Sequence, residues 1–326
     1  MAGDSPDRVP DRVPDRVPVR VPDRVPGRAA WVVGATGLLG SAVCRRLAAQ
    51  RREIRTTDVP WDDPEAAVVA LVRAAEQLPD GGWEVYWCAG AAVVGSSEAE
   101  LDAEVAVLDG FLGRWEPRPD PAGNGFFLAS SAGGVYAGAS GPPFTEHTEP
   151  APISPYGRAK LRSEEIATAF AVRTSTALLV GRLANLYGPG QNLDKPQGLI
   201  SQLCRALLTR QPLGVSVPLD TMRDYLFVDD AAAMTVAGLG SVTDSGRRAL
   251  KVLASERSTT VGAVLGDLHR LTRRRPPVVL GASPVSRYQV HDVRLRSVAW
   301  PRTSAFARTP MVSGIAATLA ALRRSP

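Results

Sequence analysis

An alternation of short apolar strands with amphipathic helices is the feature that most restricts the fold of this chain. The first strand is predicted in AAWVVG, starting at Ala29, and the helix after it in LLGSAVCRRLAAQ. Further strands are predicted in EIRTTDV, WEVYWCAG, GFFLASS and residues 176–182, and further helices in DPEAAVVALVRAAEQL, EAELDAEVAVLDGFLGRW and residues 155–172. Because consecutive parallel strands need a crossover helix, this order predicts right-handed βαβ units. The expected fold is α/β, a doubly wound parallel sheet with helices on both faces.

The turn between the first strand and the first helix reads GATGLLG, with glycines at positions 34, 37 and 40. Glycines here allow a tight turn and let the backbone approach a pyrophosphate, whose charge is favoured at a helix N-terminus. A glycine triplet alone is weak evidence, but its place after a strand and before a helix is typical of a Rossmann-type dinucleotide site. The residues of the turn that we expect to contact a cofactor are Gly34, Thr36, Gly37, Leu38, Leu39 and Gly40.

An acidic residue, Asp58, stands at the end of the second predicted strand. An acid at this place can accept hydrogen bonds from an adenosine ribose and repel a 2′-phosphate, which favours NAD over NADP. The plainer interpretation is an aspartate in a turn, and Arg55 keeps NADP open. Ala89 and Gly90 close the next strand with small residues that would let the cofactor pass.

The stretch SPYGRAK places Tyr156 and Lys160 four residues apart, on one face of a predicted helix. An ammonium beside a phenol favours the phenolate, which can accept a hydroxyl proton during hydride transfer. The pattern alone is common on exposed helices. Upstream, Ser130 and Ser131 end a predicted strand, and a hydroxyl there could hold the substrate oxygen beside Tyr156, although a serine pair can equally cap a turn. The combination of the three motifs predicts an enzyme.

The chain is expected to divide into three parts. Residues 7–26 repeat the tetrad DRVP, with one variant VRVP, and proline at every fourth position forbids a regular helix. We expect residues 1–28 to be a disordered tail, because they offer too little apolar surface to offset ordering. Residues 29–184 are predicted to form the dinucleotide-binding domain. Residues 185–326 are predicted to form a smaller substrate-binding lobe, some segments of which return to the first domain.

Composition restricts the partners. No apolar run is long enough to cross a bilayer, and the N-terminus lacks the apolar core of a signal peptide. The cysteines, Cys44, Cys88 and Cys204, have no metal-ligand spacing, so no metal site is expected and a reducing cytoplasm fits best. From Arg270 onward, eleven arginines and one acid give +10, against +5 for the whole chain. This region could steer an anionic ligand, but we favour a solvated surface, and no nucleic-acid-binding module accompanies the charge.

These motifs resemble those of the extended short-chain dehydrogenase/reductase family, in its nucleotide-sugar epimerase and dehydratase branch. The likeness runs from about Ala29 to Ala233. It rests on GATGLLG, SSAGGVYAG, PFTEHTEPAPISPYGRAKLRSEE, GRLANLYGPGQN and RDYLFVDDAA, which occur in the family's order. The set is specific for the branch and not for one substrate.

The resemblance implies roles for individual residues. The catalytic residues that it carries over are Ser131 (or Ser130), Tyr156 and Lys160. Spacing to the tyrosine favours Ser131. Asn185 and Arg223 would contact the diphosphate of a nucleotide sugar, although Arg223 could instead pair with one of the aspartates that follow it. The resemblance also implies NAD as the cofactor, bound in part by Tyr156 and Lys160, and a homodimer.

The chain departs from the family pattern at three places. Ala132 and Gly133 stand where the 4,6-dehydratases carry an Asp-Glu pair that eliminates water, which argues against a dehydratase of that kind. The helix after WCAGAA lacks the family's usual asparagine, and the nearby Glu104 is not a match for it. The C-terminal arginine that often contacts phosphate has no clear counterpart, with Arg287 and Arg294 as candidates.

These observations lead to one functional hypothesis and two alternatives. We expect an NAD-dependent epimerase that acts on a nucleotide-diphosphate sugar at C4 through a transient 4-keto sugar. A 4-ketoreductase of deoxysugar biosynthesis would use the same residues with external NAD(P)H, and Asp58 favours the epimerase. A non-catalytic dinucleotide-binding sensor is the alternative of another class, but it would have little need for Ser131, Tyr156 and Lys160 together.

Overall fold

The computed structural model describes residues 28–90, 92–120, 123–195, 197–281 and 288–324. The predicted disordered tail lies outside the described residues, except for Arg28.

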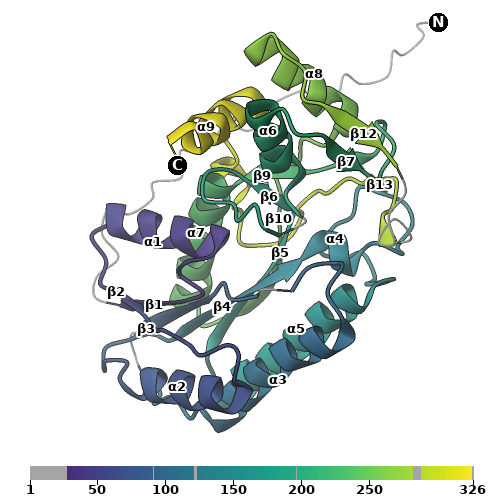
Figure 1. Cartoon of the computed structure of the whole chain (residues 1–326). Helices are drawn as coiled ribbons and strands as arrows, with labels where there is room; N and C mark the ends of the chain where they lie inside the picture. The colour runs from purple at the N-terminus through teal and green to yellow at the C-terminus, as the bar shows by residue number, and fades with distance from the viewer. Residues whose placement is uncertain (1–27, 91, 121–122, 196, 282–287, 325–326) are drawn as a thin grey trace, which may run out of the picture.

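The central element is a six-stranded sheet with the order β10-β5-β4-β3-β1-β2 (Figure 1). Its strands are β1 (Ala29–Val33), β2 (Ile54–Thr56), β3 (Trp83–Trp87), β4 (Gly125–Ser131), β5 (Ala177–Leu183) and β10 (Arg248–Leu253). Every neighbouring pair is parallel, which confirms the predicted doubly wound α/β fold. The order reverses at β1, because β2 lies on one side of it and β3 on the other.

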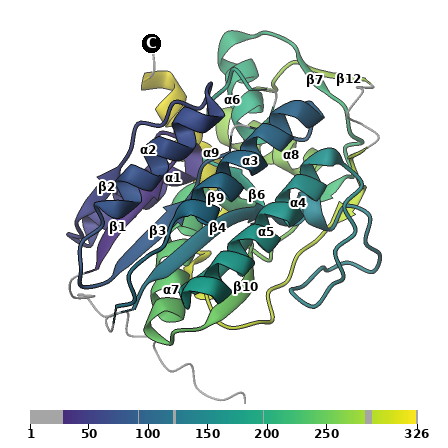
Figure 2. The same cartoon turned by 90° about the horizontal axis from the view of Figure 1, so that it is seen from below.

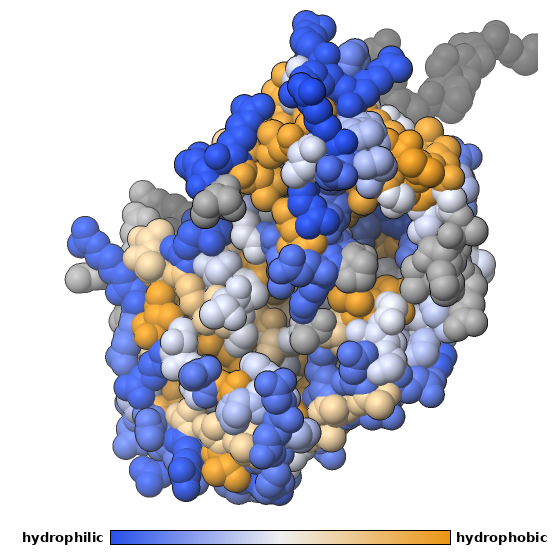
Figure 3. Space-filling view, viewed as in Figure 1, coloured by the Kyte–Doolittle hydropathy of each residue, from blue (hydrophilic) through white to orange (hydrophobic). Residues whose placement is uncertain are grey.

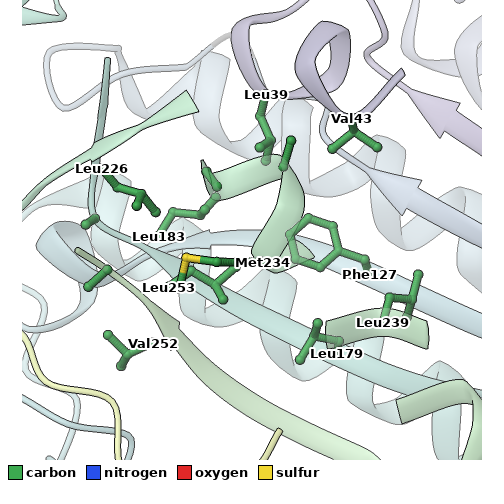
Figure 4. Packing of buried hydrophobic residues seen from close by; sticks show 14 of the residues in the cluster. Leu39, Val43, Phe127, Leu179, Leu183, Leu226, Met234, Leu239, Val252 and Leu253 are labelled. Carbon is green, nitrogen blue, oxygen red and sulfur yellow. The ribbon is translucent and has the colours of Figure 1, made fainter. Parts of the chain in front are cut away.

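Helices cover both faces of this sheet (Figures 1 and 2). One face carries α1 (Leu38–Ala49) and α7 (Val228–Asp244), and the other carries α2 (Pro64–Glu76), α3 (Glu98–Arg114) and α5 (Pro155–Thr174). Figure 4 shows the packing on the first face, where side chains of α1 and α7 meet strand residues; these include Leu39, Val43, Met234, Leu239, Phe127 and Leu179. The burial of these apolar faces fixes the register between helix and strand, and with it the ends of the strands.

The sixth strand, β10, comes from the part of the chain beyond residue 185. Its sequence RALKVL contains Lys251, which is 1% exposed. The Lys251 ammonium lies 3.6 Å from the Glu146 carboxylate and donates to the Ala299 carbonyl at 2.5 Å. A buried charge with these partners is tolerated in the sheet. Together with α7, β10 therefore brings residues 228–253 back to the first sheet.

The remaining elements form a smaller lobe above the carboxyl ends of the strands (Figure 1). Its strands are β6 (Asn185–Tyr187), β7 (Leu213–Val215), β8 (Met222–Arg223), β9 (Tyr225–Phe227), β11 (Thr259–Thr260), β12 (Val278–Leu280) and β13 (Asp292–Val293). Its helices are α6 (Leu199–Thr209), α8 (Val261–Thr272), α9 (Met311–Arg324) and the 3-10 helix η2 (Ser304–Phe306). Apolar residues of α6, α8 and α9 make a separate core. Figure 3 shows hydrophobic residues gathered over β7 and β12, where Val279 and Leu280 are each 58% exposed.

No helix in the described part of the chain combines the length and the apolar character needed to cross a membrane.

Candidate active site

The candidate site lies where the strand order reverses, at the carboxyl ends of β1 and β3. In open parallel sheets this is the place where ligands bind. Gly34 follows β1 with φ of 81°, a left-handed conformation that favours glycine. A Cβ on Gly34 would lie 2.7 Å from the Ala89 backbone, so the ends of the two strands touch here. The predicted glycine-rich turn and the small residue Ala89 therefore border the same point of the sheet.

The turn before α1 leaves the N-terminus of that helix open. Gly37 is the N-cap of α1, and no side chain accepts its first N–H groups. The Gly37 N–H donates to the Gly34 carbonyl at 3.0 Å, which closes the turn. Thr36 and Gly37 are exposed and Leu38 is half-buried, whereas the side chain of Leu39 packs into the core. The turn therefore offers free N–H groups and a positive helix end to an anion.

Gly40 is needed for the close approach of this turn to α1, which gives a first prediction. A Cβ on Gly40 would lie 2.1 Å from the Gly34 carbonyl oxygen, a distance that forces the turn and the helix apart. We expect Gly40→Ala to lower the free energy of unfolding by about 1–3 kcal/mol, measured by urea denaturation.

Gly113→Ala is the matched control, because Gly113 also lies within a helix and its added Cβ would meet nothing within 4 Å. It is expected to be neutral or to stabilise by roughly 0.5–1 kcal/mol. Equal stability of the two variants would contradict the close approach at Gly40.

Asp58 is exposed in the segment that follows β2. Arg55 is engaged elsewhere, since its guanidinium pairs with Glu53 at 2.9 Å and donates to the Gln77 carbonyl at 2.5 Å. The carboxylate therefore faces solvent at the end of β2, while the one arginine that sequence reasoning weighed against it is held by other partners.

Tyr156 and Lys160 are both brought to this edge of the sheet by α5. The helix begins at Pro155, and its N-cap Ser154 accepts the Gly157 N–H at 3.1 Å. A Cβ on Gly134 would lie 3.0 Å from two ring carbons of Tyr156, so the ring lies directly on the short helix α4 (Ala132–Val135) at the end of β4. The start of α5 is thus fixed against β4, and Tyr156 is half-buried there.

Lys160 reaches from α5 to the end of β3. Its ammonium lies 5.4 Å from the centroid of the Tyr156 ring, and a Cβ on Gly90 would lie 3.3 Å from it. Burial alone would lower the pKa of Lys160, but the neighbouring Tyr156 oxygen and the Glu104 carboxylate outweigh burial and raise it. The lysine therefore stays protonated between the phenol and Gly90, which lies three residues after β3.

The two candidate serines have different environments. Ser130 is buried and donates to the Glu164 carboxylate at 2.5 Å. Ser131 is half-buried, and its oxygen accepts the Gly134 N–H at 3.1 Å as the N-cap of α4. Since that contact uses only the oxygen, the Ser131 hydroxyl proton remains able to donate, beside the turn on which the Tyr156 ring lies. This difference favours Ser131 as the hydroxyl that faces a substrate.

The two candidate phosphate contacts lie beyond the end of β5. Asn185 is exposed, two residues after Leu183, which pairs with Ser131 across β4 and β5. Its backbone N–H donates to the carbonyl of Asp224, the residue that follows Arg223, at 3.0 Å.

Arg223 does not form the alternative salt bridges that its sequence context allowed. Its guanidinium donates to the Met222 and His291 carbonyls and to the Gln289 amide oxygen. The nearby aspartates have other partners, namely Ser255 for Asp224, Arg45 for Asp229 and Thr309 for Asp230. Burial lowers the pKa of Arg223. Among the described residues, no carboxylate lies within ion-pair distance of this guanidinium.

Of the C-terminal arginines, Arg294 pairs with Asp292 at 2.9 Å, and Arg287 lies outside the described residues. In the part of the chain that the structure describes, no group of three His, Cys, Asp or Glu side chains could hold a metal ion.

Comparison with known proteins agrees with this geometry. Residues 118–249 match the sequence profile of the NAD dependent epimerase/dehydratase family. The chain is 34% identical over 99 residues to dTDP-L-rhamnose 4-epimerase of Burkholderia thailandensis, a match that covers 30% of this chain and 27% of that protein. Residues 118–249 are therefore similar to the NAD dependent epimerase/dehydratase family.

Two further family relatives match over longer stretches. The probable low-salt glycan biosynthesis reductase Agl14 of Haloferax volcanii is 28% identical over 270 residues, which cover 75% of this chain and 87% of that protein. The solved structure of MoeE5 in complex with UDP-glucose and NAD is 25% identical and has a TM-score of 0.72, covering 92% of this chain and 99% of that one. In its first sequence matches, however, the chain spans only 27% to 40% of the length of its curated relatives.

Glu104 is the site residue whose importance sequence reasoning missed. It stands close to the position of the family's usual asparagine, and its carboxylate pairs with Lys160 at 2.9 Å. A signal was present in the sequence: Glu104 lies three residues after Leu101 and four before Leu108, within the apolar stripe that α3 buries. A carboxylate in such a stripe needs a partner, and the partner came from a helix 56 residues away along the chain.

Proposed function

We propose that this chain is an NAD-dependent epimerase that acts on a nucleotide-diphosphate sugar at C4. The observation that carries the proposal is the position of Lys160. Its ammonium lies 5.4 Å from the Tyr156 ring centroid and would lie 3.3 Å from a Cβ added at Gly90, three residues after β3. A phenol and its cation therefore border the switch point of the sheet, where a family cofactor would present its reacting ring.

The chain's own residues fit such a cofactor. Its pyrophosphate would lie on the open N-terminus of α1, against the turn formed by Gly34, Thr36, Gly37, Leu38, Leu39 and Gly40. Asp58 would accept hydrogen bonds from the adenosine ribose, and the engagement of Arg55 with Glu53 favours NAD over NADP. Ala89 and Gly90 leave room beside β3. Bound NAD would supply the hydride acceptor and donor.

The side chains of the site would then move one proton. Tyr156, as phenolate beside the protonated Lys160, would take the proton of the C4 hydroxyl and later return it. Ser131 would donate a hydrogen bond to the same oxygen, and Lys160 would also hold the ribose next to the reacting ring. Asn185 and Arg223 would anchor the diphosphate, for which a half-buried guanidinium outside ion-pair distance of any described carboxylate is suited. Rotation of the 4-keto sugar would expose its other face.

The α4 turn argues against elimination of water. Ala132 is fully buried and Gly133 has no side chain, and a Cβ on Gly133 would meet nothing within 4 Å. Neither position can hold or release a proton, so the acid and base that a 4,6-dehydratase needs after the catalytic hydroxyl are missing from this turn.

A 4-ketoreductase that consumes external NAD(P)H is the second candidate. The observation that favours it is the Haloferax relative, which is named as a reductase and matches over 75% of this chain. Purified protein should be denatured and the released nucleotide identified by chromatography. One NAD per chain, with inversion of C4 in a panel of nucleotide sugars followed by NMR, supports the epimerase. Protein free of nucleotide that oxidises NAD(P)H in the presence of a 4-keto sugar would replace it with the reductase.

We also propose that the chain forms the homodimer that the resemblance implies, and that α3 and α5 form its interface. These helices lie together on one face of the sheet, and charged pairs such as Asp102–Arg162 lie on their exposed sides. Light scattering after size-exclusion chromatography tests this, and a monomeric mass at assay concentration would exclude it.

A further inference from the structure

We infer that Glu104 is a positioning residue that acts through Lys160: its carboxylate holds the ammonium at Gly90 and offsets the positive charge that Lys160 presents to Tyr156. The inference deepens the proposed function, on which it rests in taking Tyr156 as the group that transfers the proton.

Both oxygens of the Glu104 carboxylate are used. One accepts from the Lys160 ammonium at 2.9 Å, and the other accepts the Ala92 N–H at 3.1 Å. The side chains of Lys160 and Glu104 are 10% and 20% exposed, so solvent screens the pair little. The carboxylate therefore joins α3, the segment after β3 and α5 at one point.

The same contact changes the charge that reaches the phenol. A lone ammonium 5.4 Å from the Tyr156 ring would favour the phenolate strongly in a half-buried site. A carboxylate 2.9 Å from that ammonium makes the pair nearly neutral at the distance of the phenol. Glu104 therefore offsets part of the positive charge that Lys160 presents to the phenol.

Other charged groups near the phenol are already balanced. The α4 turn contributes no charged side chain, since its sequence is AGGV. The charged pairs on the helices and strands around it are Glu98–Arg158, Asp102–Arg162 and Glu164–Arg182. The first two are exposed and the third is buried within its own network. Changing Glu104 is thus the change that alters the charge facing Tyr156 most directly.

The test is an ultraviolet titration of the phenolate in the purified full chain, which needs neither substrate nor turnover. Wild type and Glu104→Gln are each compared with the same protein carrying Tyr156→Phe, and the difference isolates Tyr156. Burial raises the pKa of four of the five other tyrosines, so these four contribute little signal; they are Tyr86, Tyr136, Tyr187 and Tyr225. Asp102→Asn is the matched control, because it removes a carboxylate from the same helix at an exposed position.

Glu104→Gln is expected to lower the midpoint of the Tyr156 titration by roughly one pH unit, and Asp102→Asn to leave it unchanged. An equal or higher midpoint in Glu104→Gln, with the circular dichroism of the native fold, would overturn the inference. Glu104→Asn serves in the same way if the glutamine variant does not fold. A wild-type midpoint near the free value of about 10 that falls in Glu104→Gln supports the role of Glu104 but counts against the phenolate in the proposed function. A low wild-type midpoint that is unchanged in Glu104→Gln would reject the role of Glu104 and leave the proposed function standing.

Discussion

Tyr156→Phe is expected to lower turnover by about 10²- to 10⁴-fold while the amount of bound nucleotide stays at the wild-type level. The ring of Tyr156 lies on Gly134, with two ring carbons 3.0 Å from the position of an added Cβ, and phenylalanine keeps that packing. Only the oxygen is lost, and with it the group that takes the hydroxyl proton. Turnover should be measured with the nucleotide sugar identified by the panel, and nucleotide content by chromatography after denaturation.

Tyr187→Phe is the control for this experiment. Tyr187 is 2% exposed in the core of the smaller lobe, where it stacks edge-on against Phe227. This variant also removes a phenol oxygen, but it leaves the carboxyl edge of the central sheet unchanged, so turnover should remain near wild type. If Tyr156→Phe kept more than a tenth of the wild-type rate, the proton would have another acceptor and the proposed mechanism would be wrong.

The alternation of strands and helices up to β5 could be predicted because each element carries its own apolar pattern. The parallel, doubly wound arrangement followed from the same pattern and from the handedness of crossovers. The residues SPYGRAK and GATGLLG could be assigned to helix start and turn because proline and glycine restrict the backbone locally. The features that depend on residues close in the sequence could therefore be predicted without the structure.

The roles of polar residues whose partners lie far away in the sequence could not be predicted. Lys251 makes β10 look like an exposed segment, and only the carboxylate of Glu146, far away in the chain, explains its burial. The difference between Ser130 and Ser131 likewise depends on Glu164, which lies on α5. Glu104 was dismissed as a mismatch because its partner Lys160 belongs to another helix. In each case a polar residue in an apolar setting was visible, but its partner was not.

Glu164→Ala is expected to lower the free energy of unfolding by about 3–5 kcal/mol. Glu164 is 8% exposed and accepts from Arg182 at 2.7 Å as well as from Ser130. Arg182 is 4% exposed, and its guanidinium also donates to the Tyr136 hydroxyl at 2.7 Å. Removing the carboxylate leaves a buried guanidinium without its counter-ion, which is the costly case for a buried ion pair. Urea unfolding at neutral pH measures the change.

Two further variants separate the charge from the helix position. Glu165→Ala removes the exposed carboxylate next in the chain and should change stability by less than about 0.5 kcal/mol. Glu164→Leu combined with Arg182→Met removes both charges and should recover much of the loss, because apolar side chains can replace a buried pair. Turnover of this double variant should lie below the wild-type turnover. The reason is that Ser130 loses the acceptor that fixes the end of β4 beside Ser131. A stability loss in Glu164→Ala as small as that of Glu165→Ala would show that Arg182 finds water or another partner, and that the network does not hold α5 and its tyrosine against β4.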